Sequence, residues 1–369
     1  MKKYEFKNDV GYAEIPFEFI RDKILLIKVS VNDNPSEYFL LDTGASSTII
    51  DLDYIKSLGL STKGEIPVRT MDGYAETGMV DIDLFSLPGL NIKNLTFSTI
   101  EFPKEMKLPD KRIVGILGGD ILSMFVVSIN FDKKLITLYE KENFEYKGDG
   151  EILDISIVSN TPVIKACLND SICGNFRIDM GCTGRLLLIG EILDKCNLIE
   201  YKDNFVKTEA LGAGGTVEVY YTRINKMSIG SFSIEDIPIG FISFEEVAQA
   251  RGEVDGSIGI GLLSRFNIYL DYQGKKIILE KNNNFGKPFV IDKSGMIVDK
   301  DEDKFIIKQV IENTPAYEAG LKEKDELIKI NGKPASNYSL SEITKLLKGN
   351  TGERIDLVVK RGRKKIEVS

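Results

Sequence analysis

The chain has 369 residues, 43% of them hydrophobic and 28% charged, and its formal net charge is −8. This composition is typical of a globular protein and excludes a disordered chain, and no apolar run is long enough for a membrane span. The acidic balance argues against nucleic-acid binding, and the length predicts two or three domains.

Histidine is absent from the whole sequence. Without it, neither a Ser-His-Asp triad, nor a Cys-His pair, nor a His-ligated zinc site can be assembled. A hydrolase of this composition has to use carboxylates, and we expect neither a metal nor a cofactor.

The cysteines and the start of the chain bear on the cellular compartment. Cys167, Cys173, Cys182 and Cys196 have no CxxC spacing, so buried free thiols are expected unless the compartment is oxidising. The chain begins without an apolar signal segment, which predicts a cytoplasmic protein or one whose export signal was trimmed.

Short strands with alternating or continuous apolar residues make up most of residues 10–280, and Gly, Asn, Asp and Pro separate them. Helical patterns are few, so the fold is expected to be mainly β. We expect strands at 24–31, 39–41, 80–84, 135–139, 224–229 and 276–280.

A unit of about thirty residues occurs twice, 137 positions apart. The first copy ends in Leu41-Asp42-Thr43-Gly44 and the second in Ile178-Asp179-Met180-Gly181. A second motif, Gly115 to Gly118, recurs as Gly256 to Gly259. Two such copies can face each other across a pseudo-two-fold axis and bring Asp42 and Asp179 together. The repeat predicts two lobes, residues 1–145 and 146–284.

A different pattern follows the polar, Gly- and Pro-containing stretch at 282–288, which is a natural domain boundary. A strand is expected at 305–311, and a short helix should end at Gly320. Ser339 and Glu342 form a capping-box pattern at the start of a second helix, and a strand pair ends at Val368. Residues 285–369 are therefore expected to form a small α+β domain.

The Asp-Thr-Gly sequence at 42–44 follows an apolar strand, and Ile116-Leu117-Gly118 comes about 75 residues later. This arrangement, with its repetition, resembles the bacterial retropepsin-like and pepsin-like aspartic peptidases. The resemblance implies a duplicated, two-lobed acid-protease fold with Asp42 and Asp179 as the catalytic dyad. It also implies that Gly118 and Gly259 pack beneath the two aspartate loops, and that the Thr43 hydroxyl braces the opposite loop.

Two carboxyl groups within hydrogen-bond reach share one proton. The ionised partner then takes a proton from a bound water, which attacks the peptide carbonyl, and the protonated partner stabilises the oxyanion. Gly44 and Gly181 are needed because a Cβ would keep the two loops apart. Ala45 completes the first loop.

The second copy departs from the family pattern, because Met180 stands where Thr43 has a hydroxyl, and Cys182 replaces Ala45. Three interpretations stay open. The chain is an endopeptidase of extended polypeptides with an Asp42/Asp179 dyad, a catalytically degenerate peptide-binding adaptor, or a dimer that pairs Asp42 of two chains.

In this family a hairpin flap closes over the substrate, and the residues at 71–74, which include Gly73 and Tyr74, are the candidate by position. Tyr74 either donates a hydrogen bond into the cleft or is an ordinary surface tyrosine of a turn. The glycine-rich segment at 212–215 is expected to be a hairpin tip of the second lobe.

The segment from Glu312 to Leu321, followed by Asp325 to Gly332, resembles a bacterial PDZ domain. The resemblance implies that a peptide or protein C-terminus binds as an added strand, with its carboxylate in a nest of backbone amides. Gly295, Met296 and Ile297 are the candidate nest, and a plain glycine turn is the alternative. The family also implies export to the bacterial cell envelope or secretion.

Overall fold

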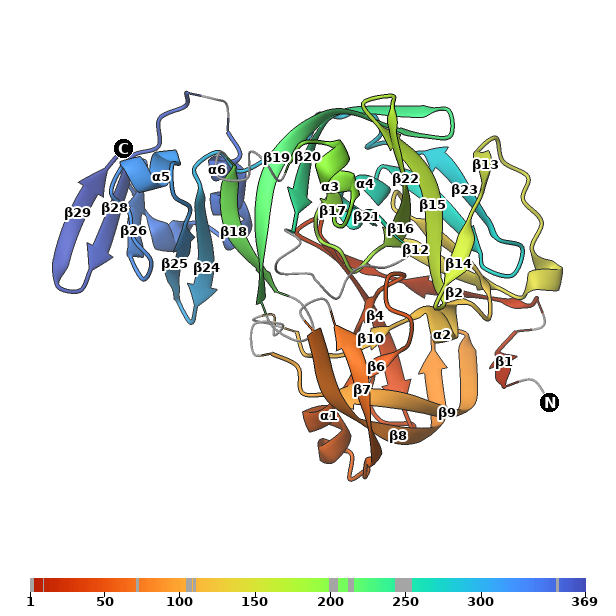
Figure 1. The fold of residues 1–369 in the computed structure, drawn as a ribbon. Coiled ribbons are helices and arrows are strands. Elements are labelled where there is room, and N and C mark those ends of the chain that lie inside the picture. Colours follow the sequence, from red (N-terminus) through yellow and green to blue (C-terminus); the bar gives the residue numbers. More distant parts are fainter. Residues whose placement is uncertain are drawn as a thin grey trace. The chain divides into compact units, whose positions relative to one another are not determined.

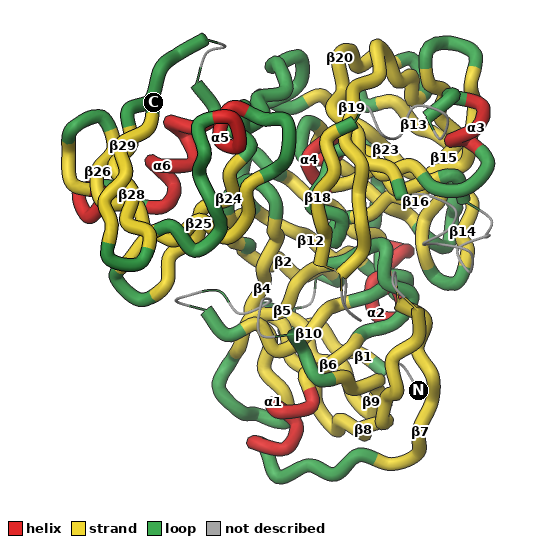
Figure 2. Tube along the Cα trace, turned by 60° about the vertical axis from the view of Figure 1, so that its left-hand side comes forward, coloured by secondary structure: helices red, strands yellow, loops and turns green. Residues whose placement is uncertain are grey.

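The structure is a computed structural model that describes residues 3–8, 10–70, 73–103, 108, 111–198, 205–211, 216–242, 254–349 and 352–369, with the backbone alone at 65–70, 73–76, 209–211 and 216. The chain is mainly β, as predicted. It divides into two compact units, one of Met1–Lys202 and Glu209–Lys287, the other of Asp203–Thr208 and Pro288–Ser369. Figure 2 shows that helix is confined to short segments between the strands.

The first sheet of the larger unit follows the order β1-β9-β6-β10-β5-β4-β8-β7, and β3 pairs with β4. Because β8 pairs with both β4 and β9, the sheet closes on itself. One helix, α1 (Leu52–Ser57), follows β6. The strands are β1 (Tyr4–Phe6), β3 (Glu18–Ile20), β4 (Ile24–Val31), β5 (Glu37–Leu41), β6 (Ile49–Asp51), β7 (Lys63–Thr70), β8 (Gly73–Leu87), β9 (Leu90–Ile100) and β10 (Ile113–Leu117).

The second sheet has the order β14-β15-β16-β21-β17-β20-β19-β18. It also closes, because β19 pairs with both β15 and β20. The path β15-β16-β21-β17-β20 repeats the path β4-β5-β10-β6-β9 of the first sheet. Figure 1 draws the strands of the first sheet in red to orange and those of the second in yellow to cyan. The elements are β14 (Ser156–Val158), β15 (Thr161–Leu168), β16 (Ile172–Asp179), β17 (Leu186–Leu188), α3 (Ile192–Lys195), β18 (Val206–Leu211), β19 (Thr216–Ile229), β20 (Phe232–Phe241) and β21 (Gly256–Gly259).

A third, antiparallel sheet joins strands from both halves of this unit in the order β13-β23-β22-β11-β12-β2. At its centre β11 pairs with β22, with Ser128 opposite Tyr269. The sequence predicted β12 and β23 as strands but not this shared sheet, because apolar periodicity does not identify a distant pairing partner. The elements are β2 (Tyr12–Pro16), α2 (Gly119–Leu122), β11 (Val126–Asn130), β12 (Leu135–Tyr139), the 3-10 helix η2 (Lys141–Asn143), β13 (Glu151–Asp154), α4 (Ile260–Leu263), β22 (Phe266–Asp271) and β23 (Lys276–Lys281).

Strand alternation sets the direction of the two aspartates. In β16, Phe176 and Ile178 are buried in the core, and Arg177 and Asp179 lie on the opposite, partly exposed face. Successive side chains of a strand point to opposite faces. The buried apolar residues of β16 therefore direct Asp179 away from the core, and β5 does the same for Asp42, which follows its buried Leu41.

Two of the four cysteines form a disulfide, Cys167–Cys173, which closes the β15–β16 hairpin. The expectation of four free thiols was wrong for this pair, and it holds for Cys182 and Cys196. The two bonded residues lie directly opposite each other, with their Cα atoms 3.9 Å apart. A spacing of six residues does not reveal this proximity until the turn between the strands is known.

The smaller unit is built on one sheet of order β24-β25-β26-β28-β29, to which β27 adds at β26. The predicted capping box at Ser339 and Glu342 is confirmed at the start of α6. The elements are β24 (Met296–Asp301), β25 (Lys304–Val310), α5 (Pro315–Glu318), β26 (Glu326–Ile330), β27 (Lys333–Pro334), the 3-10 helix η4 (Ala335–Asn337), α6 (Leu340–Leu347), β28 (Leu357–Arg361) and β29 (Lys364–Val368).

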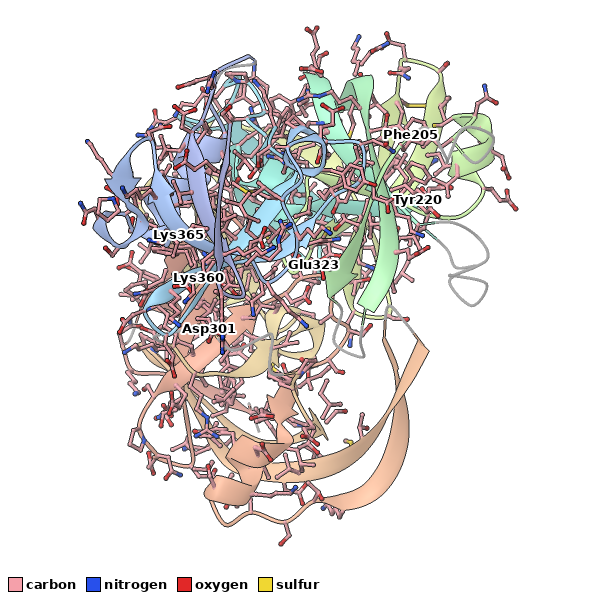
Figure 3. The ribbon with its side chains drawn as sticks, turned by 90° about the vertical axis from the view of Figure 1, so that its left-hand side faces the viewer. Phe205, Tyr220, Asp301, Glu323, Lys360 and Lys365 are labelled. Atoms are coloured by element: carbon pink, nitrogen blue, oxygen red, sulfur yellow. A yellow bond between two sulfur atoms is a disulfide. The ribbon has the colours of Figure 1, made fainter. Side chains whose placement is uncertain are left out.

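An ion pair anchors the β28–β29 hairpin, on which Lys360 and Lys365 lie opposite each other (Figure 3). Asp325 is fully buried, and Arg361 contacts its carboxylate at 2.6 Å. Burial opposes ionisation of Asp325, but the hydrogen bonds from Arg361 and from the Lys322 N–H prevail and lower its pKa.

We expect Arg361→Gln to lower the free energy of unfolding of the smaller unit by about 3 kcal/mol, because it leaves the Asp325 carboxylate buried without its partner. We use the lower end of the range of stability losses known for broken buried ion pairs, since Arg361 is itself partly exposed. Urea unfolding of the variant measures the change, with Arg363→Gln on the exposed turn as the control. Equal stability of the two variants would contradict the prediction.

No helix in the described part of the chain combines the length and the apolar character that crossing a bilayer requires.

Candidate active site

Each aspartate leaves its sheet at the carboxyl end of a strand beside a parallel neighbour. The Asp42 N–H donates to the Leu117 carbonyl at 3.0 Å, where β5 runs parallel to β10. Asp179, the last residue of β16, lies beside Gly259, the last residue of β21. The Asp-x-Gly loops and the two partner motifs predicted from the sequence thus lie next to each other in the larger unit.

Gly118 and Gly259 allow the partner motifs to pack directly against the backbone of the aspartate loops. A Cβ on Gly118 would lie 2.5 Å from the carbonyl of Ser47, and one on Gly259 would lie 2.5 Å from the oxygen of Gly184. Non-bonded carbon atoms do not approach so closely without displacement of the neighbour. Glycine is therefore required at both positions by packing.

The two aspartate loops face each other reciprocally. A Cβ on Gly44 would lie 2.4 Å from Cγ of Asp179, and a Cβ on Gly181 would lie 2.3 Å from Cγ of Asp42. Each carboxyl group therefore rests against the glycine of the opposite loop. Asp42 and Asp179 are brought together within one chain.

Backbone amides orient both carboxylates. Oδ1 of Asp42 accepts hydrogen bonds from the N–H groups of Gly44 at 2.7 Å and Ala45 at 3.1 Å. Oδ1 of Asp179 accepts one from the Cys182 N–H at 2.8 Å. Because this donor is a main-chain group, the replacement of alanine by cysteine in the second loop does not remove it.

The pair is electrostatically strained in its doubly ionised form. Burial, and then the negative charge of Asp179, raise the pKa of Asp42 to about 7, although the amide hydrogen bonds and the positive charge of Arg177 oppose the rise. Two close carboxyl groups avoid double ionisation by keeping one proton between them. Below this pH the site therefore holds one proton that can be transferred.

Thr43 connects the two loops from a fully buried position. Its hydroxyl donates to the Ile178 carbonyl at 2.7 Å and accepts from the Met180 N–H at 3.0 Å. Met180 is also fully buried, and its thioether cannot donate a return hydrogen bond. The brace between the loops is therefore made by one side chain, which bonds the backbone groups on either side of Asp179.

We expect Thr43→Val to lower the free energy of unfolding of the larger unit by about 2 kcal/mol or more, because the Ile178 carbonyl and the Met180 N–H are left buried without partners. Thermal unfolding measures this loss. Thr43→Ser keeps the hydroxyl and is the matched control. The same stability in the Val and Ser variants would show that the two hydrogen bonds do not support the loops.

Two charged or polar residues near the pair were missed by the sequence analysis. Arg177 precedes Asp179 by two positions and shares its face of β16. Tyr272 is 4% exposed, and its hydroxyl has no hydrogen-bond partner among the residues that the structure describes. Burial, and secondarily the charge of Asp42, raise the pKa of Tyr272. The alternation of buried and exposed residues in β16 could have placed Arg177 on the same face as Asp179. No sequence pattern indicated that Tyr272 lies near the pair.

Cys182 lies beside the pair but is not a nucleophile. Burial, and then the negative charge of Asp179, raise the pKa of its thiol to about 12. The thiolate is the reactive form of cysteine, so the neutral thiol leaves the carboxyl pair as the reactive element. Within the described residues there is no cluster of three or more acidic or cysteine side chains that could hold a metal ion.

The candidate flap falls partly outside the described residues. Gly73 pairs with Thr70, and Tyr74 pairs with Arg69, at the end of the β7–β8 hairpin. Met71 and Asp72, the side chain of Tyr74 and the segment 212–215 lie outside what the structure describes. The flap stays a prediction.

The candidate carboxylate nest of the smaller unit contains a carboxylate of the chain itself. Oδ1 of Asp292 accepts from the Ser294 N–H at 2.8 Å, and the Gly295 N–H also donates to this side chain. The Met296 N–H donates to the Ser294 hydroxyl at 3.2 Å, and Ile297 is 45% exposed on β24. A peptide carboxylate at this loop would have to displace Asp292, and the nest stays a prediction.

Comparison with known proteins gives matches to separate parts of the chain. The model of the aspartyl protease family matches residues 27–121, which include Asp42 and β10, and the model of the PDZ domain matches residues 306–361. The carboxy-terminal processing protease CtpA of Bacillus subtilis is 27% identical over 108 residues, which are 29% of this chain and 23% of that protein.

Two further relatives are similar over comparable lengths. A probable CtpA-like serine protease of Staphylococcus saprophyticus is 31% identical over 94 residues, 26% of this chain and 19% of that protein. One of Staphylococcus haemolyticus is 28% identical over 100 residues, 27% of this chain and 20% of that protein. The chain thus spans about a fifth of the curated relatives it matches, and the two staphylococcal ones are named as probable serine proteases. The family models give an aspartyl protease domain at residues 27–121 and a PDZ domain at 306–361.

Proposed function

We propose that the chain is an aspartic endopeptidase that cleaves extended polypeptides with Asp42 and Asp179. In this proposal residues 1–145 and 146–284 are the two lobes of a pepsin-like fold, and 285–369 form a PDZ domain that binds a peptide or protein C-terminus. The observation that carries the proposal is the reciprocal fit of each carboxyl group against the glycine of the opposite loop.

The reaction needs one proton on the pair. With Asp42 protonated, Asp179 accepts a proton from a water between them as the water oxygen bonds to the peptide carbonyl carbon. The Asp42 O–H donates to the developing oxyanion. The leaving nitrogen then takes a proton as the C–N bond breaks, which gives an acid and an amine and returns the pair to its singly protonated form.

The serine type of the relatives is not carried over to this chain. Their names describe proteins of which the chain spans about a fifth, and the matched stretch is 27% of the chain, far less than the unit that carries both aspartates. The chain also has no histidine for a Ser-His-Asp triad.

A peptide-binding adaptor without activity is the second candidate, and the buried Met180 favours it, because the second bracing hydroxyl is lost there. Pairing of Asp42 between two chains is not proposed, since each carboxyl group already has a partner in its own chain.

Cleavage of a mixed library of extended peptides by the full chain, followed by mass spectrometry between about pH 3 and 9, tests the proposal. We expect kcat/KM to fall about tenfold per pH unit above about 7, where Asp42 loses its proton. A chelator should leave the rate unchanged. No cleavage at any pH would favour the adaptor, and a rate that stays constant up to pH 9 would exclude the shared proton.

A further inference from the structure

We propose that Arg177 forms a subsite for an acidic side chain, Asp or Glu, of the bound peptide. The inference rests on the proposed function, because it takes the face that carries Asp179 as the surface on which the peptide lies. It adds the chemical class of the preferred substrate.

Arg177 is placed by β16 on the same face as Asp179. Two residues of a strand span about 7 Å, and they point to the same side. Arg177 is partly exposed on this side, between the buried Phe176 and Ile178. Although burial dominates the pKa of Asp42, the positive charge of Arg177 also acts on it. The guanidinium group therefore lies close enough to reach a peptide held at the carboxyl pair.

The Nε of Arg177 has no hydrogen-bond acceptor among the residues that the structure describes. This Nε is buried. A buried charged donor without an acceptor is unfavourable. A carboxylate of the ligand would satisfy it, and the planar guanidinium group fits a carboxylate with two parallel hydrogen bonds.

Arg177 belongs to a row of residues that lie opposite one another on neighbouring strands of the second sheet. The equivalent row of the first sheet has side chains of a different chemical type, although its strands follow the same order. Across β4, β5, β10 and β6 the row consists of Leu26, Leu40, Ile116 and Ile49. Across β15, β16, β21 and β17 it consists of Val163, Arg177, Ser257 and Leu187.

The first row is part of an apolar cluster, whereas the second row has a cation and a buried hydroxyl in the two middle positions. An extended peptide presents successive side chains to opposite sides. The difference between the rows predicts a substrate with an apolar side chain on one side of the cut and an acidic one on the other.

Apolar residues border the proposed subsite. Leu187 packs with a small cluster that includes Val219 and Ile242. Gly240, beside Leu187 in the same row, has no side chain. An ion pair gains strength where apolar groups exclude water. Arg177 is therefore better placed to select a carboxylate than an arginine on the open surface.

Kinetics on matched peptides test the subsite with the full chain. The peptides share an apolar sequence with an amidated C-terminus, and each has a single Glu, or Gln in its place, at a different position. We expect kcat/KM to favour Glu by roughly 10- to 100-fold at one fixed position relative to the cut. Arg177→Gln should abolish this preference, and Arg177→Lys should retain part of it.

Arg223→Gln is the matched control, because Arg223 belongs to the same sheet but is already paired with Asp236 at 2.6 Å. This variant should keep the preference for Glu. Equal rates for Glu and Gln in the parent protein, or a preference that survives Arg177→Gln, would overturn the subsite. An increase in kcat/KM that occurs only with peptides whose C-terminus is a free carboxylate would also overturn it, because Arg177 would then bind the terminal carboxylate and not a side chain.

The subsite and the proposed function fail in different ways. Cleavage without preference for Glu refutes the subsite alone. If no peptide is cleaved, the peptidase proposal fails. Binding then decides the subsite: the Asp179→Asn variant is titrated with the Glu and the Gln peptides, and the two Kd values are compared. A ratio of one at every position overturns it, and a tenfold ratio that Arg177→Gln removes supports it.

Discussion

Asp42→Asn and Asp179→Asn should each reduce peptide cleavage by roughly 10³-fold or more. The amide is nearly isosteric with the carboxyl group, and its oxygen still accepts hydrogen bonds from the loop, such as those of Gly44 and Ala45 to residue 42. It cannot hold or release the shared proton, however. The loss should therefore come from chemistry while the loops stay in place.

The double variant should be no slower than either single one, because the two carboxyl groups act as a unit. Asp170→Asn is the control: Asp170 lies in the turn of the same β15–β16 hairpin and pairs with Lys226 at 2.7 Å, away from the carboxyl pair. Activity that survives Asp179→Asn would contradict the intramolecular pair and point to pairing between chains.

Stability provides a second measurement for Asp42→Asn. A carboxyl group whose pKa is raised on folding stabilises the protein below its unfolded value near 4, and this contribution is lost as the pH rises to about 7. The variant should therefore have a higher Tm than the parent at pH 8, and the difference should vanish near pH 3. A lower Tm of the variant at pH 8 would exclude the raised pKa.

Local patterns predicted those parts of the fold that depend on neighbours in sequence. The strand at 24–31 was predicted from its apolar residues and the turns beside it, and it is confirmed as β4. The capping box at Ser339 depends on two residues three positions apart, and it is also confirmed. Such features need no knowledge of the rest of the chain.

Features that depend on distant pairing could not be predicted in this way. The central pairing of β11 with β22 joins strands more than a hundred residues apart. The Cys167–Cys173 bond required the register of a hairpin. The bracing of the opposite loop by Thr43 was expected from the resemblance to aspartic peptidases, and local patterns alone did not identify the two backbone groups that it bonds, those of Ile178 and Met180. The repeat indicated that Asp42 and Asp179 are equivalent, but it did not indicate that the Nε of Arg177 finds no hydrogen-bond acceptor among the described residues.

Gly44→Ala and Gly181→Ala should lower kcat/KM by about 100-fold, because each adds a Cβ where a carboxyl group lies. The distances to Cγ of the opposite aspartate would be 2.4 and 2.3 Å, so the carboxyl groups must move. Crowding of this kind should also lower the free energy of unfolding by roughly 1–3 kcal/mol. Chemical denaturation and steady-state kinetics on one peptide measure both effects.

Gly184→Ala is the matched control, three residues beyond Gly181, because its Cβ would meet only the Cys182 sulfur, at 3.7 Å. The residual activity of Gly181→Ala carries further information. If the methyl group moves Asp42 away from Asp179, the negative charge that helps to raise the pKa of Asp42 acts from farther away. The fall in kcat/KM should then begin at a lower pH than in the parent protein, whereas an unshifted profile with full activity would show that the carboxyl groups are not in contact with the opposite glycines.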